Sequence, residues 1–292
     1  MQSIDSSYLR PRLLSRDNET HKRHYGHLLI VAGCETMPGA AVLACGAALQ
    51  SGCGLVTLHS TFNALQAVAV NYPSAMLSEE PEEHFCTVPQ KLNKYAVIAV
   101  GPGLGRSAGT MNALMDLIGL AHEEKIPLVM DADALNILSC IPDWPDILPQ
   151  GTILTPHMGE LRRLLPHVSE QNLDSLVREL CLYAHCTLVK KGYRTKVFTP
   201  DGECLVNTTG NPGMAKGGSG DVLTGLVGGL LARGYAAPDA AALGVWLHGY
   251  AGDLLTRTRT AEAYSSRELI GQLWTGFHAL YQTSEKDVCP NA

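Results

Sequence analysis

Short apolar runs alternate with longer amphipathic stretches along most of this chain. Residues 27–33, 95–100 and 126–130 are almost wholly apolar, as expected for strands that are buried on both faces of a sheet. Each run ends at glycine or aspartate, and a stretch with helical spacing follows it. Since strands that alternate with helices form parallel pairs, the pattern predicts an α/β fold of three layers, with a central, mostly parallel sheet between helices.

Helices are predicted where apolar residues recur with a period near 3.6. The stretches with this spacing are 40–51, 61–71, 222–231, 239–255 and 265–281. Two short runs on either side of a Pro-Asp-Gly turn predict a β-hairpin, at residues 196–199 and 204–206. No repeat or linker interrupts this order. We therefore expect one domain over residues 1–292, with an ordered core from about residue 25 to 282.

Composition narrows the class of protein. The chain has 292 residues and a net charge of −6, which argues against nonspecific nucleic-acid binding. No apolar run approaches the roughly 18 residues of a membrane helix, and the polar N-terminus lacks a secretory signal. Nine cysteines, without a Cys-x-x-Cys pair, argue against a disulfide framework and favour a cytoplasmic protein. Cys45, Cys53 and Cys140 have apolar neighbours and are expected to be buried thiols.

The stretch 210–225 carries the clearest chemistry. Its proline and repeated glycines exclude regular structure, and an apolar stripe that begins at Val222 then starts a helix. Residues 217–220 therefore lie at a helix N-terminus, where free N–H groups and the positive end of the helix dipole attract an anion. The predicted phosphate-binding hole includes Gly218, Ser219 and Gly220.

Asp221 follows this hole directly. An aspartate at a helix start is usually a cap, but a cap needs no glycine loop before it. A carboxylate beside a phosphate site can take the proton of a hydroxyl that attacks phosphorus, so Asp221 is the candidate general base. Lys216 does not complete a Walker A loop, because Ala215 precedes it and Gly217 follows it where that loop needs Gly before the Lys and Ser or Thr after it.

Two other strand ends carry candidate ligand contacts. Gly101-Pro102-Gly103-Leu104-Gly105 is a glycine turn that does not fit the dinucleotide fingerprint, because its third glycine comes one place early. From the residues alone, a tight turn and a ligand contact are equally good explanations. Asp131 and Asp133 follow residues 126–130, and alternation predicts that they point to the same side. Asp133 is expected to cap the helix 134–139, while Asp131 is a candidate for magnesium or substrate contact.

A third strand end, residues 153–160, places His157 one helical turn before Glu160, so both can face one pocket. A lone histidine there is more often a cap, and no second His or Cys at ligand spacing supports zinc. Further on, residues 190–196 form the basic cluster that an anionic ligand of an acidic protein needs.

Together these motifs resemble the ADP/ATP-dependent NAD(P)H-hydrate dehydratases, a branch of the ribokinase-like fold. The resemblance rests on Asn211-Pro212-Gly213-Met214-Ala215 and Gly217-Gly218-Ser219-Gly220-Asp221, and it spans about residues 25–281. It implies contacts to the hydrated nicotinamide from Ala40, Gly103, His157 and Asp221. It implies contacts to the adenine nucleotide from Lys191, Gly192, Tyr193, Arg194, Thr195 and Gly220. It also implies that Glu160 arranges Mg²⁺ through water, and that Lys216 stands where the family usually has Thr or Ser.

The resemblance implies an ADP-dependent lyase that restores NADH or NADPH from the hydrated S-epimer by phosphorylating the C6 hydroxyl, with Mg²⁺ as cofactor. It also implies a homotetramer, and a dehydratase without the epimerase domain that some relatives carry. ATP in place of ADP stays an alternative, and so does the choice between the two hydrates. A small-alcohol kinase of the same fold is the main rival, and a nucleotide sensor without catalysis ranks last because Asp221 is present.

Overall fold

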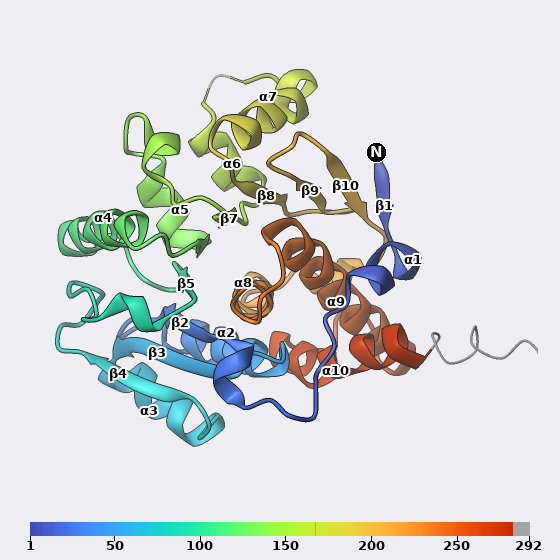
Figure 1. Cartoon of the computed structure of the whole chain (residues 1–292), viewed down its shortest axis with the longest axis horizontal. Coiled ribbons are helices and arrows are strands. Elements are labelled where there is room, and N and C mark those ends of the chain that lie inside the picture. The colour runs from blue at the N-terminus through green and yellow to red at the C-terminus, as the bar shows by residue number, and fades with distance from the viewer. Residues whose placement is uncertain (167, 283–292) are drawn as a thin grey trace, which may run out of the picture.

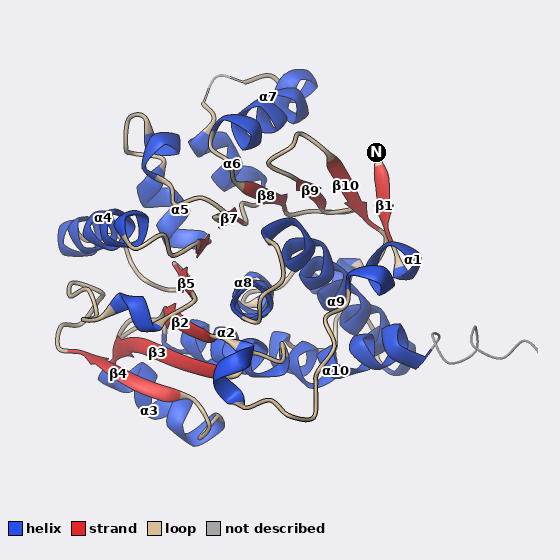
Figure 2. Ribbon diagram, viewed as in Figure 1, coloured by secondary structure: helices blue, strands red, loops and turns tan. Residues whose placement is uncertain are grey.

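The computed structural model of the chain describes residues 1–166 and 168–282. Its centre is one ten-stranded sheet in the order β1-β10-β9-β8-β7-β6-β5-β2-β3-β4 (Figures 1 and 2). The strands are β1 Gln2–Ile4, β2 His27–Val31, β3 Leu55–Thr61, β4 Met76–Glu80, β5 Val97–Val100, β6 Leu128–Met130, β7 Ile153–Leu154, β8 Thr187–Lys190, β9 Lys196–Phe198 and β10 Cys204–Asn207. β9 runs antiparallel to β8 and β10, and the other neighbouring pairs are parallel, so the mostly parallel sheet is confirmed.

Helices cover both faces of this sheet. They are α1 Ser6–Leu9, α2 Pro38–Gln50, α3 Phe62–Asn71, α4 Ala108–Glu123, α5 Ala132–Leu138, α6 Met158–Leu164, α7 Glu170–Tyr183, α8 Ser219–Ala232, α9 Ala237–Thr258 and α10 Ser266–Gln282. One apolar core lies between the sheet and α2, α3, α8, α9 and α10, and a second between the sheet and α4 to α7 (Figure 1). Among the described helices, none combines the length and the apolar character that a membrane crossing needs.

Strand alternation explains how one apolar run serves both cores. Leu28 and Ile30 of β2 face the first core, while Leu29 and Val31 face the second. On the first face, α2 and α8 cross closely because both carry small residues: a Cβ on Gly225 would lie 2.0 Å from the carbonyl oxygen of Ala44. The alanines and glycines of α2 therefore serve helix packing.

The order of the sheet reverses at β2 and β5. From β2 the chain continues outward through β3 and β4, whereas from β5 it continues the other way through β6, β7 and β8. At such a reversal, the connections after the two central strands lead to opposite sides of the sheet. Open α/β sheets bind ligands at this point. The loops that follow β2, β5, β6, β7 and β8 are the loops in which the sequence places candidate residues.

The N-terminal arm is more ordered than its sequence indicates. β1 extends the sheet beside β10, with Ile4 opposite Asn207, and the side chains of Ile4 and Leu9 are fully buried. The expected start of the ordered core near residue 25 is therefore too late. The run is only three residues long, and its partner strand lies about 200 positions away, so no local pattern reveals it.

The cysteines differ in burial. Cys45 is buried in α2 as expected, and Cys53 is half-buried beside the carbonyl oxygen of Leu55. The prediction for Cys140 is wrong, because its side chain is exposed. α5 ends at Leu138, and Cys140 lies in the turn that follows. Its side chain is therefore exposed, although the preceding residues Ile137 and Leu138 are buried.

Candidate active site

The glycine loop before α8 forms the expected N-terminal hole. Gly218 is the N-cap residue with φ of +85°, a left-handed conformation that only glycine adopts freely, and α8 begins at Ser219. Among the described residues, the backbone amides of Gly217, Gly218 and Gly220 have no hydrogen-bond acceptor. Three free N–H groups at the positive end of a 14-residue helix attract an anion.

Asp221 lies in the first turn of α8, next to these amides. Burial, together with the negative charge of Asp131 and against the opposing charge of Lys191, raises the pKa of its carboxyl group from 3.8 to about 6. A carboxyl group with a pKa near 6 is mostly ionised at neutral pH and is a stronger base than an ordinary aspartate. The position and the pKa both suit a general base.

A buried ion pair lies beside Gly220. The Nζ of Lys191 donates to Asp131 at 2.6 Å, and the hydroxyl of Thr224 donates to the other Asp131 oxygen at 2.6 Å. A Cβ on Gly220 would lie 3.3 Å from Lys191 Nζ and 3.4 Å from Asp131 Oδ2. A side chain at position 220 would therefore press against this ion pair, and the positive charge of Lys191 lies next to the amide hole.

His157 and Glu160 begin α6 with a reciprocal cap. The Nδ1 of His157 accepts the N–H groups of Gly159 and Glu160, and Glu160 Oε2 accepts the N–H of His157 at 2.8 Å. Since Nδ1 is an acceptor, the ring proton is on Nε2, and more than half of this side chain is exposed. Glu160 is buried, which raises the pKa of its carboxyl group, and Oε2 lies 3.8 Å from Lys191 Nζ.

Ala40 and Gly103 meet at the reversal point of the sheet. Gly103 follows β5 with φ of +62°, and a Cβ on it would lie 2.8 Å from the Cβ of Ala40 in the first turn of α2. Leu43, almost one turn along α2, packs against Gly218. Ala40 and Leu43 thus place the start of α2 beside both Gly103 and the amide hole.

The segment 191–195 lies in the loop between β8 and β9. Lys191 pairs in parallel with His157, so this loop lies beside the start of α6. The side chain of Tyr193 is 90% exposed, and Thr195 donates its hydroxyl to the carbonyl oxygen of Gly192. Lys191 is directed inward to Asp131, while residues 192–194 are exposed.

The two aspartates after β6 do not behave as the alternation predicts. The chain turns at Ala132, which has φ of +49°, and α5 begins there, so Asp133 lies within the helix rather than capping it. Asp133 instead accepts the N–H of Gly105 at 2.9 Å. The prediction that both carboxylates point to the same side is wrong, because the helix begins two residues earlier than expected.

Comparisons with known proteins identify this set of residues. A family model for NAD(P)H-hydrate dehydratase matches residues 28–274. The chain belongs to the NAD(P)H-hydrate dehydratase family. It is 39% identical over 248 residues to the ADP-dependent (S)-NAD(P)H-hydrate dehydratase of Neisseria meningitidis serogroup B, which covers 82% of this chain and 81% of that protein. The chain spans about half the length of the bifunctional NAD(P)H-hydrate repair enzymes that it also matches.

Solved structures agree with this family. The ADP/ATP-dependent NAD(P)H-hydrate dehydratase of Bacillus subtilis, co-crystallised with ATP and Mg²⁺, has a TM-score of 0.80 and 29% identity, over 96% of this chain and 98% of that one. A ribokinase-like superfamily protein of Enterococcus faecalis has a TM-score of 0.84 and 27% identity, over 96% of each chain. The predicted family and the ribokinase-like fold are both confirmed.

Among the carboxylates described at this site, Glu160 is the one that fits the magnesium implied by the family. Both oxygens of Asp131 are bonded inside the protein, by Lys191 and Thr224. Glu160, the other buried carboxylate nearby, accepts the N–H of His157 with Oε2, and its Oε1 lies 3.3 Å from Nε2 of the half-exposed His157 ring. Within residues 1–166 and 168–282, no group of three His, Cys, Asp or Glu side chains could hold a metal. Mg²⁺ usually keeps several waters and binds one or two carboxylates together with nucleotide phosphates. The residues therefore suit an ion carried by the nucleotide, with Glu160 as its protein contact.

Two residues at this dehydratase-family site carry no sequence signal. Thr224, one turn after Asp221 on α8, holds Asp131. His248 of α9 lies with Nε2 3.3 Å from the hydroxyl oxygen of Ser219, and burial lowers its pKa to about 4, so its ring is neutral. His248 follows a run of apolar residues in the sequence, which is typical of a packing role. Only the crossing of α8 and α9 brings it to the hole.

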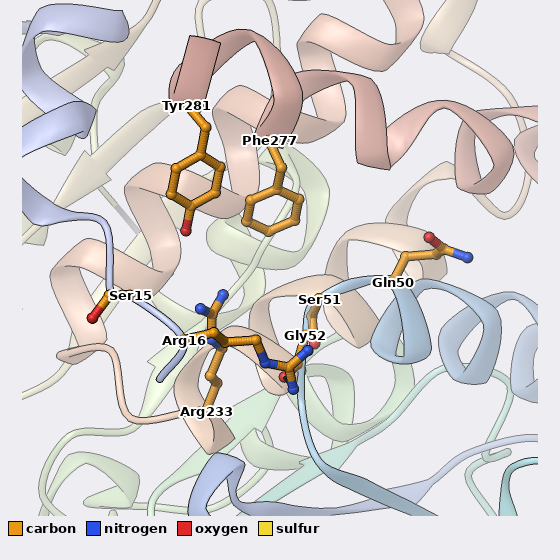
Figure 3. Close-up of a pocket in the computed structure, with 8 residues that line it drawn as sticks. All are labelled: Ser15, Arg16, Gln50, Ser51, Gly52, Arg233, Phe277 and Tyr281. Carbon is orange, nitrogen blue, oxygen red and sulfur yellow. Dashed lines mark hydrogen bonds between the residues drawn. The ribbon is translucent and has the colours of Figure 1, made fainter. Parts of the chain in front are cut away.

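A separate cavity of about 400 Å³ lies near the other end of α8. Figure 3 shows the guanidinium groups of Arg16 and Arg233 close to Gly52, with the rings of Phe277 and Tyr281 on the opposite wall. Arg233 donates to the carbonyl oxygen of Leu14, and Arg16 to that of Gly52. Both arginines therefore fasten the N-terminal arm, and none of the predicted site residues lines this cavity.

Proposed function

We propose that this chain catalyses the ADP-dependent dehydration of the S-epimer of hydrated NADH or NADPH, which restores the reduced cofactor and releases AMP and phosphate. The observation that supports this most directly is the base of raised pKa beside a free amide hole, Asp221 after Gly217, Gly218 and Gly220. The Neisseria relative, similar over most of both chains, bears the name of this activity.

The proposed reaction begins with phosphoryl transfer. The hydroxyl oxygen at C6 of the hydrated ring attacks the β-phosphorus of ADP, its proton passes to Asp221, and AMP leaves. The amides of Gly217, Gly218 and Gly220, with Lys191 next to them, stabilise the charge that develops on the phosphoryl group. Mg²⁺, when bound, adds positive charge across the nucleotide phosphates.

Elimination follows because hydroxide is a poor leaving group and phosphate is a good one. The lone pair of the ring nitrogen expels phosphate from C6, and loss of a proton from the adjacent carbon restores the ring double bond. The Nε2 proton of His157 and the small residues Ala40 and Gly103 would hold and orient the nicotinamide while this happens. The segment from Lys191 to Thr195 would hold the adenine nucleotide.

The decisive test is Asp221→Ala. We expect a loss of about 10²-fold or more in kcat, the usual contribution of a general base, with ADP binding retained. The assay mixes hydrated NADH, Mg²⁺ and ADP or ATP in turn and follows the absorbance of the reduced nicotinamide. Asp116→Ala, at an exposed position of α4, is the matched control. Near-normal turnover by Asp221→Ala would reject the proposed role.

A small-alcohol kinase is the second candidate, because it needs the same base and amide hole. It would release a stable phosphoester, whereas the dehydratase releases free phosphate and restores absorbance. Phosphate release without a phosphorylated alcohol therefore separates the two. The tetramer and the cytoplasmic location implied by the resemblance stay predictions, and light scattering of the purified protein tests the first.

A further inference from the structure

Lys216 departs from the residue expected in this family, and its ammonium group lies in a ring of backbone carbonyls. Nζ donates to the carbonyl oxygens of Ala261 at 2.9 Å, Glu262 at 2.9 Å and Tyr264 at 2.6 Å. An ammonium group has three N–H donors, so all of them are used. The ring of Tyr264 adds a cation–π contact at 4.5 Å. The side chain thus points to segment 261–264, with no N–H donor left for a phosphate.

The carbonyl ring supports the amide hole. Lys216 directly precedes Gly217, and its own carbonyl oxygen accepts the N–H of Ser219 at 3.3 Å. Ser266 donates its hydroxyl to the carbonyl oxygen of Gly217 at 2.7 Å, and Tyr264 donates to Asn211 at 2.9 Å. The segment 261–266 is therefore joined to the glycine loop at three points, with the Lys216 ammonium in the middle.

The charge of Lys216 is met by carbonyl oxygens, and no carboxylate of the described residues lies within ion-pair distance of it. Three convergent carbonyl oxygens around a single positive charge are the surroundings that proteins also give to a dehydrated monovalent cation. Without a cation, these oxygens would face one another with their negative ends and would repel. The ring therefore requires a positive charge in order to keep its shape.

We propose that Lys216 is a positioning residue whose ammonium group acts as a tethered monovalent cation. It holds segment 261–266 against the glycine loop and keeps the amides of Gly217, Gly218 and Gly220 aimed at the phosphoryl group; this rests on the proposed function. A corollary follows for variants. If the side chain is shortened, the emptied ring will take a free cation of similar size, such as NH₄⁺ or K⁺.

The test compares two variants that differ in the space they leave. Lys216→Ser empties the ring, whereas Lys216→Met fills it with an uncharged chain of similar length. In a buffer with tetramethylammonium as the only monovalent cation, we expect both to lose about 10- to 100-fold in kcat/KM, the effect of a misplaced catalytic group. At constant ionic strength, KCl or NH₄Cl restores Lys216→Ser but not Lys216→Met, and the wild-type rate does not respond.

Lys94→Ser is the matched control. Lys94 makes a cation–π contact with Tyr95 at 4.8 Å but, in the described part of the chain, has no ring of carbonyl acceptors. We expect it to keep wild-type kinetics in every buffer. Full activity of Lys216→Ser in tetramethylammonium, or a loss that neither KCl nor NH₄Cl reverses, would overturn the proposal.

Two readouts do not depend on turnover. The melting temperature of Lys216→Ser is expected to rise with KCl, while those of Lys216→Met and the wild type do not. Calorimetric affinity for Mg-ADP is expected to follow the same pattern. If the wild type fails to dehydrate the hydrated cofactors, these measurements still decide the role of Lys216, so the two failures are distinguishable.

Discussion

The carboxyl group of Asp221 sets a pH dependence for the reaction. Because burial and the charge of Asp131 raise its pKa to about 6, the base is protonated in acid, and kcat/KM is expected to fall below about pH 6. Initial rates from pH 5 to 8 measure this limb. The nucleotide phosphate also titrates near pH 6, so a second variant is needed. Asp131→Asn removes a negative neighbour and should move the limb to lower pH; an unmoved limb would belong to the nucleotide.

The same carboxyl group lowers stability at neutral pH. Its pKa is about 6 in the folded chain and 3.8 when exposed, so the folded state binds the proton more tightly, and folding is penalised once the group ionises. The penalty is absent below pH 3.8, grows from there to pH 6, and then stays constant at up to about 3 kcal/mol. Asp221→Asn is therefore expected to unfold at higher denaturant concentration than the wild type at pH 7.5.

The control for this prediction is pH itself. Below about pH 4 both proteins carry a neutral side chain at position 221, and their unfolding midpoints should coincide. Equal midpoints at pH 7.5 would mean that the carboxylate is stabilised by a partner. A more stable but inactive variant is the pattern expected of a residue retained for catalysis.

At the level of single residues, the sequence predicted the features that depend on neighbours in the chain and missed those that depend on distant strands. Asp221 and the glycines before it were predictable because a helix start and its free amides follow from the order of residues alone. The pairing of Lys191 with Asp131 was not, because 60 positions separate them and only the sheet joins β6 to β8. Glu160 and His157 were predicted to share a pocket, and the structure does bring them together: they cap each other, and Nε2 of His157 lies 3.3 Å from Oε1 of Glu160.

At the level of elements, Gly218 controls the start of α8. Its φ of +85° would strain an alanine by about 1–2 kcal/mol, and the added Cβ would lie 2.3 Å from Cδ1 of Leu43. The end of Leu43 can turn away, but the backbone angle cannot change without moving the amides. We expect Gly218→Ala to lower the melting temperature by a few degrees and to weaken Mg-ADP binding, measured by calorimetry.

Gly217→Ala is the control for that element. A Cβ at this position has no described atom within 4 Å, and the backbone there is not left-handed, so the melting temperature should stay at the wild-type value. If the two variants melt alike, the left-handed turn is not what fixes the helix start.

The helices and strands were easier to predict than their ends. Apolar runs such as Val97–Val100 are visible because a strand buried on two faces has little room for polar residues. α5 illustrates the limit: a left-handed residue, Ala132, starts it early, and that conformation has no signature when the residue is not glycine. Because of that single turn, Asp133 lies inside the helix and does not cap it.

At the level of the whole molecule, the order of the sheet brings the site together. Ala40 and Gly103 follow the two central strands, while Asp131, His157 and Lys191 follow successive strands on one side of them. α8 packs against β2, β5 and β6, and its first turn places Asp221 near the charges of Asp131 and Lys191. The sequence predicts parallel strands, but not their order, because any order of βαβ units produces the same alternating pattern.

The N-terminal arm provides the last prediction, because it links parts of the molecule that are distant in sequence. Ile4 is fully buried beside β10, Thr208 donates to its carbonyl oxygen, and the carbonyl oxygen of Leu14 accepts hydrogen bonds from Arg233 and Tyr281. Ile4→Ala should therefore cost about 2–4 kcal/mol of the free energy of unfolding, through lost burial and the cavity left behind.

The exposed neighbour Ser3 gives the comparison, since Ser3→Ala changes no buried contact and should alter stability by less than about 0.5 kcal/mol. Denaturant unfolding measures both variants, and kcat at low temperature should match the wild type in each, because β1 packs against β10 and α9 and contains none of the predicted site residues. If Ile4→Ala unfolds like Ser3→Ala, β1 is not part of the cooperative fold and the sheet effectively ends at β10. If it also loses activity while still folded, the arm acts on the site through α9, which packs against both β1 and α8.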